Sequence, residues 1–188
     1  MNKINCLILA AGKHKNNDTA CSLWTFSNGK SILDWQYHTL NLAIENPSIQ
    51  IAIGYKYEEV VKKYKNLNFS RIKNWEEGNS LRSLLEADFP LSDSLLVMYG
   101  DTVFRYESIR ELIRVNEDIV IGVDSKWKSR FTDRSFDDIE IAEKIETPND
   151  GTLEYTGLIK FSPKVLKFIK ENNNSLKDKS FLDLISLL

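Results

Sequence analysis

The stretch INCLILAAG, residues Ile4–Gly12, decides the fold, because a short apolar run ends there in two alanines and a glycine. Short runs rich in leucine or β-branched residues are typical of strands that are buried on both faces of a parallel sheet. The same pattern recurs at Ile49–Ile53, Leu95–Tyr99 and Ile119–Val123. We therefore expect Ile4–Leu9 and these three runs to be parallel strands.

Helical patterns separate the apolar runs. We expect caps at Ser31, at Ser108 with Glu111 as a capping box, and at Ser162 followed by Pro163. The apolar positions expected to face the core are Ile32, Trp35 and Leu42, then Val60, Val61 and Tyr64, then Leu81, Leu84 and Leu85, then Leu112 and Ile113, then Val165, Leu166 and Ile169. This alternation predicts one α/β domain over residues 1–188, a three-layer sandwich around a mixed, mostly parallel, Rossmann-like sheet.

The bulk composition narrows the class of protein. The chain has 188 residues, a net charge of −2 and 42% hydrophobic residues, so it suits one globular domain and no broad attraction to nucleic acid is expected. Cys6 and Cys21 make no disulfide framework, and Cys6 is expected to be a buried free thiol. Every apolar run is too short for a signal peptide or a membrane span. We therefore expect a soluble, cytoplasmic protein with neither nucleic acid nor a membrane as partner.

Two polar features follow expected strands, at the edge of an α/β sheet where ligands bind. The small residues Ala10–Gly12 would let a ligand approach the backbone, and Lys13 adds positive charge beside them. A plain turn from strand to loop explains that segment equally well. Asp101 follows Gly100 and could hold Mg²⁺, which prefers oxygen ligands. A turn aspartate that caps the next segment is the alternative.

Two further segments have the chemistry of a binding site. Asn79 and Ser80 begin an amphipathic helix whose N–H groups could bind an anion or a base, although a simple N-cap explains them as well. Asp124 ends a strand, and Lys144 lies in another expected strand further along. The loop after Asp124 contains four cations that could clamp a phosphate or phosphonate, Lys126, Lys128, Arg130 and Arg134. A solvated loop of mixed charge is equally plausible there, with Trp127 as a core anchor.

Taken in order, these segments resemble nucleotidyltransferases of the sugar-phosphate type, which have a Rossmann-like, GT-A-like fold. The segments that carry the resemblance are LILAAGK from Leu7, NGKSILDWQYHTL from Asn28, IAIGYKYEEV from Ile51, NWEEGNSLRSL from Asn74, VMYGDTVFRYESIRELI from Val97, DIVIGVDSKWKSR from Asp118, EIAEKI from Glu140 and EYTGLIKFS from Glu154. From Asn74 to Ser162 they are most similar to the enzymes of phosphonate biosynthesis, to which choline-phosphate cytidylyltransferases are related.

The resemblance implies a reaction in which a phosphate or phosphonate oxygen attacks the α-phosphorus of CTP and pyrophosphate leaves. It implies that Leu9, Ala10, Ala11 and Gly12 cradle the nucleotide, that Asn79 and Ser80 lie against the nucleoside, that Asp101 binds Mg²⁺, and that Asp124, Lys144 and Glu154 face the acceptor. Lys13, Lys144 and Asp101 are then the catalytic residues. A phosphoenolpyruvate mutase-type partner is expected from the same resemblance, and a homo-oligomer is left open.

The chain departs from the family pattern in three places. His14 and Asn16 stand where the family has a glycine and an arginine, and Cys21–Ser22 stand where it has Pro-Lys. The family's second metal carboxylate, near its C-terminus, has no counterpart before Leu188. These departures leave open a degenerate relative that binds a nucleotide or a partner enzyme without turnover. An ordinary sugar-1-phosphate nucleotidyltransferase is a third interpretation, which the segment around Trp127 disfavours.

Overall fold

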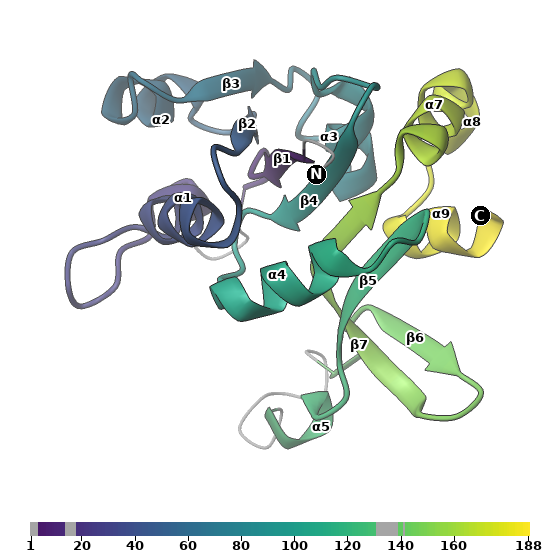
Figure 1. Cartoon of the computed structure of the whole chain (residues 1–188). Coiled ribbons are helices and arrows are strands. Elements are labelled where there is room, and N and C mark those ends of the chain that lie inside the picture. The colour runs from purple at the N-terminus through teal and green to yellow at the C-terminus, as the bar shows by residue number, and fades with distance from the viewer. Residues whose placement is uncertain (1–3, 14–17, 131–138, 141) are drawn as a thin grey trace.

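The structure, a computed structural model, describes residues 4–13, 18–130, 139–140 and 142–188, and Figure 1 draws the rest in grey. Within these residues, seven strands form one sheet in the order β3-β2-β1-β4-β7-β5, and β6 pairs with β7. The strands are β1 (Ile4–Leu9), β2 (Ser48–Ile53), β3 (Asn68–Arg71), β4 (Ser94–Tyr99), β5 (Ile119–Asp124), β6 (Lys144–Thr147) and β7 (Gly151–Phe161). The four expected strands are thus confirmed.

The strand directions make the sheet mixed but mostly parallel, as predicted. β1 is parallel to β2 and to β4, and β2 is parallel to β3. β7 is antiparallel to both β4 and β5, so β5 runs in the same direction as β4 without touching it. The expectation that Ile119–Val123 is buried on both faces is wrong, because β5 is an edge strand whose residues are half-buried and Val123 is exposed.

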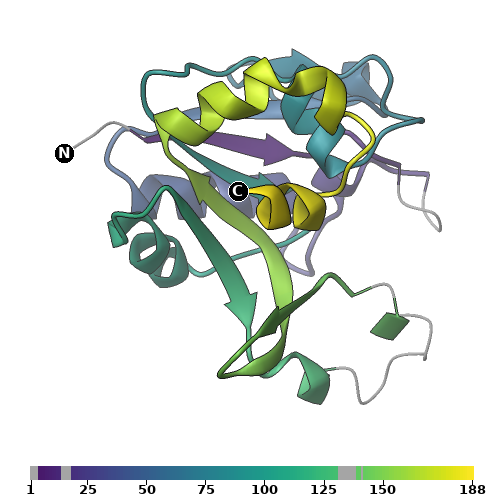
Figure 2. The ribbon, with the colours of Figure 1, turned by 90° about the vertical axis from the view of Figure 1, so that its right-hand side faces the viewer.

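Helices cover both faces of the sheet, which confirms the three layers (Figures 1 and 2). The helices are α1 (Ile32–Ala43), α2 (Tyr57–Lys63), α3 (Ser80–Glu86), α4 (Tyr106–Arg114), α5 (Trp127–Arg130), α7 (Pro163–Glu171), α8 (Asn173–Leu176) and α9 (Phe181–Leu187), with a 3₁₀ turn at Cys21–Leu23. One core packs α1, α2 and α4 on the sheet, and the other packs α3, α7 and α9. Among the described residues, none of these helices has the length and apolar content of a membrane span.

The observed helix caps and buried helix faces agree in part with those predicted from the sequence. Ser31 caps α1 in a capping box with Asp34, and Ser162 caps α7 with Pro163 at its start. The predicted face of α1 is wrong, because Trp35 and Leu42 are exposed. The helix instead buries Leu33, Gln36 and Leu40, which follow the 3.6-residue period from Ile32 more closely.

The capping box predicted at Ser108 and Glu111 is also wrong. α4 begins two residues earlier, at Tyr106, and its cap residue Arg105 makes no side-chain capping bond. Ser108 therefore lies inside the first turn. The apolar face of this helix was nevertheless placed correctly, since Leu112 is buried.

The β6–β7 hairpin and α5 project from the lower side of the sheet (Figures 1 and 2). β7 is long enough to pair with β4 and β5 near its C-terminal end and with β6 near its start. A bulge at Gly157, whose φ is +80°, lets the strand change course between these two parts. The hairpin thereby brings residues from far along the chain to the carboxyl ends of β1 and β4.

Candidate functional site

The loops that leave β1 and β4 lie side by side, as the sequence predicted. Leu9 pairs with Tyr99 at the ends of the two strands, and the Gly100 N–H donates to the Leu9 carbonyl at 2.8 Å. A Cβ added to Gly100 would lie 2.4 Å from the Ala10 Cβ, so only glycine allows this approach. Ala10–Gly12 and Asp101 therefore belong to one site at the edge of the sheet.

The backbone beside this site is partly committed to the sheet. Ala10 donates its N–H to the Ala52 carbonyl at 2.9 Å, and the Ala11 carbonyl accepts from the Tyr55 N–H at 2.8 Å. The side chains of Leu9, Ala10 and Ala11 are buried, whereas Gly12 is exposed. The N–H of Ala10 therefore already has a partner in the sheet, and the binding role of Leu9–Gly12 stays a prediction.

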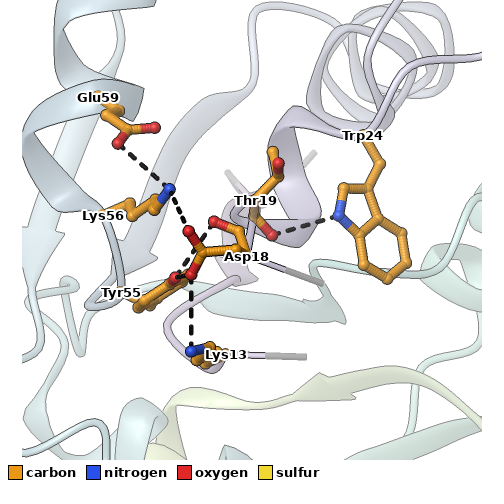
Figure 3. Close-up of polar contacts among 7 residues, drawn as sticks. All are labelled: Lys13, Asp18, Thr19, Trp24, Tyr55, Lys56 and Glu59. Atoms are coloured by element: carbon orange, nitrogen blue, oxygen red, sulfur yellow. Dashed lines mark hydrogen bonds and ion pairs between the residues drawn. The ribbon is translucent and has the colours of Figure 1, made fainter. Parts of the chain in front are cut away.

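Lys13 belongs to a surface cluster around Asp18 (Figure 3). Its Nζ lies 3.6 Å from Asp18 Oδ1, and Lys56 Nζ lies 3.4 Å from Oδ2 of the same carboxylate. Tyr55 donates its hydroxyl to Asp18 Oδ1 at 2.5 Å. The neighbours His14, Lys15 and Asn16 fall outside the described residues.

A pocket of about 270 Å³ opens at the ends of β2 and β3. Its walls are Gly54, Arg71, Ile72, Lys73 and Trp75. The Trp75 side chain packs on Gly54, where an added Cβ would lie 2.4 Å from the Trp75 Cβ and 2.5 Å from its ring atom Cγ. The centroid of the Trp75 ring lies 5.1 Å from that of the Tyr55 ring. The sequence analysis missed Tyr55 and Trp75, although both stand in the segments that carry the family resemblance.

Asn79 and Ser80 are at the start of α3, where both interpretations placed them. The Asn79 side chain accepts from the Arg82 N–H at 3.0 Å, so it is the N-cap that the simpler interpretation expected. Its Nδ2 also donates to the Lys179 carbonyl at 2.7 Å, which ties α3 to the segment before α9. These bonds give Asn79 a structural role, and contact with a nucleoside stays a prediction.

Asp101 is exposed at the tip of the loop after β4, and α1 fixes that loop. Gln36 is fully buried and donates its side-chain N–H groups to the carbonyls of Tyr99 at 2.8 Å and Thr102 at 2.6 Å. These two bonds bracket Gly100–Asp101 and hold the carboxylate at the site. Nothing in the sequence pattern pointed to Gln36, because a buried glutamine on a helix has no periodic signal of its own.

Asp101 fits the chemistry of a magnesium ligand, since it is an accessible carboxylate beside the loop after β1, which the sequence predicts to bind phosphates. Mg²⁺ commonly takes only one or two protein carboxylates, with waters and substrate phosphates as its other ligands. Among the described residues, no three His, Cys, Asp or Glu side chains gather closely enough to form a metal centre without such help. The magnesium assignment therefore stays a prediction.

The three residues expected to face an acceptor lie in one row across the sheet. Asp124 of β5 pairs with Glu154 of β7, and Glu154 pairs with Lys144 of β6. Directly opposed residues on antiparallel strands point to the same face, so the three side chains are neighbours. The structure thus brings together residues that are up to 30 positions apart in sequence.

Trp127 supports this row from α5, as the core anchor that was predicted. It is buried, and its Nε1 donates to the Thr152 carbonyl at 2.9 Å. Lys128 and Lys144 lie over its ring, with their Nζ atoms 5.6 and 5.9 Å from the ring centroid. The Arg130 side chain and all of Arg134 fall outside the described part of the chain.

Glu143 is a site residue that the sequence analysis missed. Its carboxylate accepts from the Tyr99 hydroxyl at 2.9 and 3.1 Å. Burial raises the pKa of Glu143, and although the Tyr99 hydrogen bond lowers it, the charges of Asp101 and Glu154 raise it further. Glu143 therefore links Asp101 electrostatically to the acceptor row. The sequence feature that could have identified Glu143 is its position directly before Lys144, a residue that was already predicted to face the acceptor.

Aromatic rings pack beneath Glu143. Tyr99 lies 5.6 Å from Tyr155 and 6.0 Å from Phe181, measured between ring centroids. Burial, followed by the charge of Glu143, raises the pKa of both tyrosines, so their hydroxyls stay protonated and can donate. Phe181 comes from α9, so part of the apolar C-terminal segment packs internally at this site.

The position where a lysine was expected is occupied by apolar packing. Cys21 and Ser22 are buried in the 3₁₀ turn after the loop, and both Cys21 and Cys6 are free thiols. Burial, together with the charge of Asp101, raises the pKa of Cys21 to about 11. Cys21 is therefore a neutral thiol beside Asp101.

Comparison with known proteins places the fold. No family model matches the chain. It is 27% identical over 192 residues to CTP:phosphoglutamine cytidylyltransferase of Campylobacter jejuni, which covers 87% of this chain and 75% of that protein. The inositol-1-phosphate CTP transferase of T. maritima superposes with a TM-score of 0.68 at 15% identity, over 98% of this chain and 80% of the other. The chain has the nucleotidyltransferase fold.

A second solved structure gives the same result. The 4-diphosphocytidyl-2C-methyl-D-erythritol synthase of Anaerococcus prevotii superposes with a TM-score of 0.60 at 17% identity, over 99% of this chain and 82% of the other. The similarity to CTP:phosphoglutamine cytidylyltransferase supports an enzyme of this kind. In open α/β sheets ligands commonly bind at the carboxyl ends of the strands, which is where the loops after β1 and β4 begin.

Proposed function

We propose that this chain transfers CMP from CTP to a small acceptor that carries a phosphate or a phosphonate, with release of pyrophosphate. The observation that carries the proposal is the meeting of two sets of residues at one edge of the sheet. Ala10–Gly12 and Asp101 form one set, and Asp124, Glu154 and Lys144 form the other, with Glu143 between them. The sequence similarity to CTP:phosphoglutamine cytidylyltransferase supports CTP as the donor.

The reaction needs little covalent chemistry from the protein. An oxygen of the acceptor's phosphate or phosphonate attacks the α-phosphorus of CTP, the bond from that phosphorus to the bridging oxygen breaks, and pyrophosphate leaves. Catalysis of this kind depends on positioning and on neutralising charge. Lys13 neutralises charge at the triphosphate end, and Lys144 binds the acceptor's anionic group at the other. Asp101 holds Mg²⁺, which supplies further neutralisation of the triphosphate when bound.

The acceptor end favours a small molecule with more than one polar group. Lys144 lies opposite Glu154, which lies opposite Asp124, and Glu143 comes directly before Lys144 in the chain, so residues of both signs of charge line the proposed acceptor end. A phosphonate headgroup, as in the family that the sequence resembles, and a phosphorylated headgroup both have an oxyanion for Lys144. We favour these acceptors over a sugar 1-phosphate because the segment around Trp127 resembles the phosphonate branch of the family.

A pyrophosphate-release assay tests the proposal. CTP, GTP and UTP are each offered with Mg²⁺ and with 2-aminoethylphosphonate, phosphocholine or phosphoglutamine as acceptor. We expect release with CTP, and a loss of about 10²–10³-fold in rate for Asp101→Asn, the size seen when one charge-stabilising group is removed. Asp93→Asn, at the opposite end of β4, is the matched control and should keep the wild-type rate. An Asp101→Asn variant with undiminished rate would remove the basis for the metal assignment.

A second candidate function follows from the buried Cys21–Ser22 segment, which puts no cation where the family has one. In that case the chain binds CTP, or a partner such as a phosphoenolpyruvate mutase, without turnover. Isothermal titration separates the two candidates, because binding of CTP without pyrophosphate release supports the second. The absence of both binding and release with every nucleotide would overturn both.

A further inference from the structure

The carboxylate of Asp18 is surrounded by groups that bind anions. Lys13 and Lys56 come from different segments of the chain, yet their ammonium groups lie within 3.6 Å of the two oxygens of this one carboxylate. The Tyr55 hydroxyl donates to the same group (Figure 3). Two cations and a hydroxyl around one carboxylate are also the partners that a phosphoryl group would take.

We propose that Lys13 and Lys56 together form the polyphosphate-binding site of this chain, and that Asp18 occupies this site in the free protein as an internal competitor. The proposal rests on the proposed function and adds Lys56 and Asp18 to it. The Asp18 oxygens stand for phosphoryl oxygens of the nucleotide, which displace them on binding.

Lys56 is held at this place by the end of β2. Tyr55, its neighbour, donates its backbone N–H to the Ala11 carbonyl, so the segment is tied directly to the loop after β1. Lys56 itself has φ of +51° and is the N-cap residue directly before α2, and this left-handed conformation sets the direction of its side chain. The Nζ atoms of Lys13 and Lys56 lie 5.2 and 5.7 Å from the centroid of the Tyr55 ring, which gives both cations a common platform.

The contacts of Asp18 are of a kind that a stronger anion can displace. Its side chain is 82% exposed, and ion pairs between exposed groups are weak because water screens them. A triphosphate has several negative charges where Asp18 has one, so it gains more from the same two cations. The hydrogen bond from Tyr55 and then the charge of Lys56 lower the pKa of Asp18, so the competitor is ionised at neutral pH.

Binding of inorganic tripolyphosphate, measured by isothermal titration at low salt, tests the proposal without any base or acceptor. Asp18→Asn should bind about threefold to fivefold more tightly than the wild type, because loss of one exposed competitor has the effect of one or two surface ion pairs. Lys56→Met and Lys13→Met should each bind about fivefold more weakly. Lys62→Met, an exposed lysine of α2, is the control and should match the wild type.

Glu59→Gln separates competition from a general change of charge. Glu59 lies 3.5 Å from Lys56 but is not paired with Lys13, so its removal should tighten binding less than Asp18→Asn does. Equal effects of the two variants would show that net charge, and not the shared carboxylate, is responsible. Unchanged or weaker binding by Asp18→Asn, or equal binding by Lys56→Met and Lys62→Met, would overturn the inference.

The two proposals fail separately. If the variants change tripolyphosphate binding as expected while no nucleotide gives pyrophosphate, the inference stands and the proposed transfer does not. If pyrophosphate is released from CTP but Asp18→Asn and Lys56→Met bind tripolyphosphate as the wild type does, only the inference is lost. No binding of tripolyphosphate by either the wild type or Asp18→Asn also overturns it.

Discussion

At the acceptor end of the site Tyr99 donates its hydroxyl to Glu143, and at the polyphosphate end Tyr55 donates its hydroxyl to Asp18. The first pair is partly buried over a cluster of aromatic rings, and the second lies on the surface. Burial raises the pKa of Glu143, whereas the pKa of Asp18 is lowered by its partners. A hydrogen bond from a tyrosine hydroxyl to a carboxylate therefore has two different effects. It fixes Glu143 at the acceptor end, where the pair is partly buried, whereas at the exposed polyphosphate end Asp18 can be replaced by another anion.

The largest expected effect is a loss of stability at the acceptor end, caused by a substitution that strains the backbone of β7. Gly157 has φ of +80°, and a Cβ added there would lie 2.5 Å from Cδ2 of the Tyr99 ring. Gly157→Ala should destabilise the protein by about 2–4 kcal/mol, from left-handed strain and overpacking together. Urea denaturation measures the change. Gly151→Ala is the control, since it shares a positive φ of +69° but has open space, and should cost about 1 kcal/mol.

A smaller effect compares the two hydroxyl groups directly. Tyr99→Phe should destabilise the protein by about 1–2 kcal/mol, because it leaves the partly buried carboxylate of Glu143 without its donor. Tyr55→Phe removes the matching hydroxyl from the exposed pair and should leave the midpoint of thermal unfolding unchanged. If both variants lost stability equally, the proposed contrast between the two ends would be wrong.

The smallest effect concerns the pH dependence of the acceptor end. Because the pKa of Glu143 is raised in the folded protein, the folded state binds its proton more tightly than the unfolded state does. Ionising this group therefore lowers stability as the pH rises through and above its ordinary value of 4.5. Glu143→Gln should gain stability relative to the wild type between pH 4 and about pH 7.

Unfolding free energies measured across this range give the test. Glu146→Gln, at an exposed position of β6 three residues after Glu143, controls for loss of a charge from the hairpin. A Glu143→Gln difference that stays constant over the range, or that falls as the pH rises, would contradict the raised pKa of Glu143.

Several local features could be predicted from the sequence because their causes act over a few residues. The apolar run before Ala10 predicts β1, the run before Gly100 predicts β4, and the Ser31 and Ser162 caps predict the starts of α1 and α7. The expectation that the loops after β1 and β4 meet is confirmed, because the ends of neighbouring parallel strands share one edge of a sheet. The binding roles of the residues there are still predictions.

Other parts could not be predicted, since they depend on contacts between distant segments. Trp35 was placed in the core of α1, but the sheet selects the face that carries Leu33, Gln36 and Leu40. Gln36 has its function only because the loop after β4 passes over it. Lys56 and Asp18 meet across 38 positions of the chain, and although Lys56 stands in the IAIGYKYEEV segment, nothing in that segment indicates that it meets Asp18.

By itself the sequence determined four of the strands, several of the helices and where some of them begin, and that polar groups follow the first and third apolar runs. Only the tertiary structure decided that β7 lies between β4 and β5, and that Glu143 lies within electrostatic reach of both Asp101 and Glu154. The physical reason is the distance along the chain over which each kind of interaction acts. Propensities and caps act between near neighbours, whereas strand order is set by burial of whole faces, which residues far apart in sequence share.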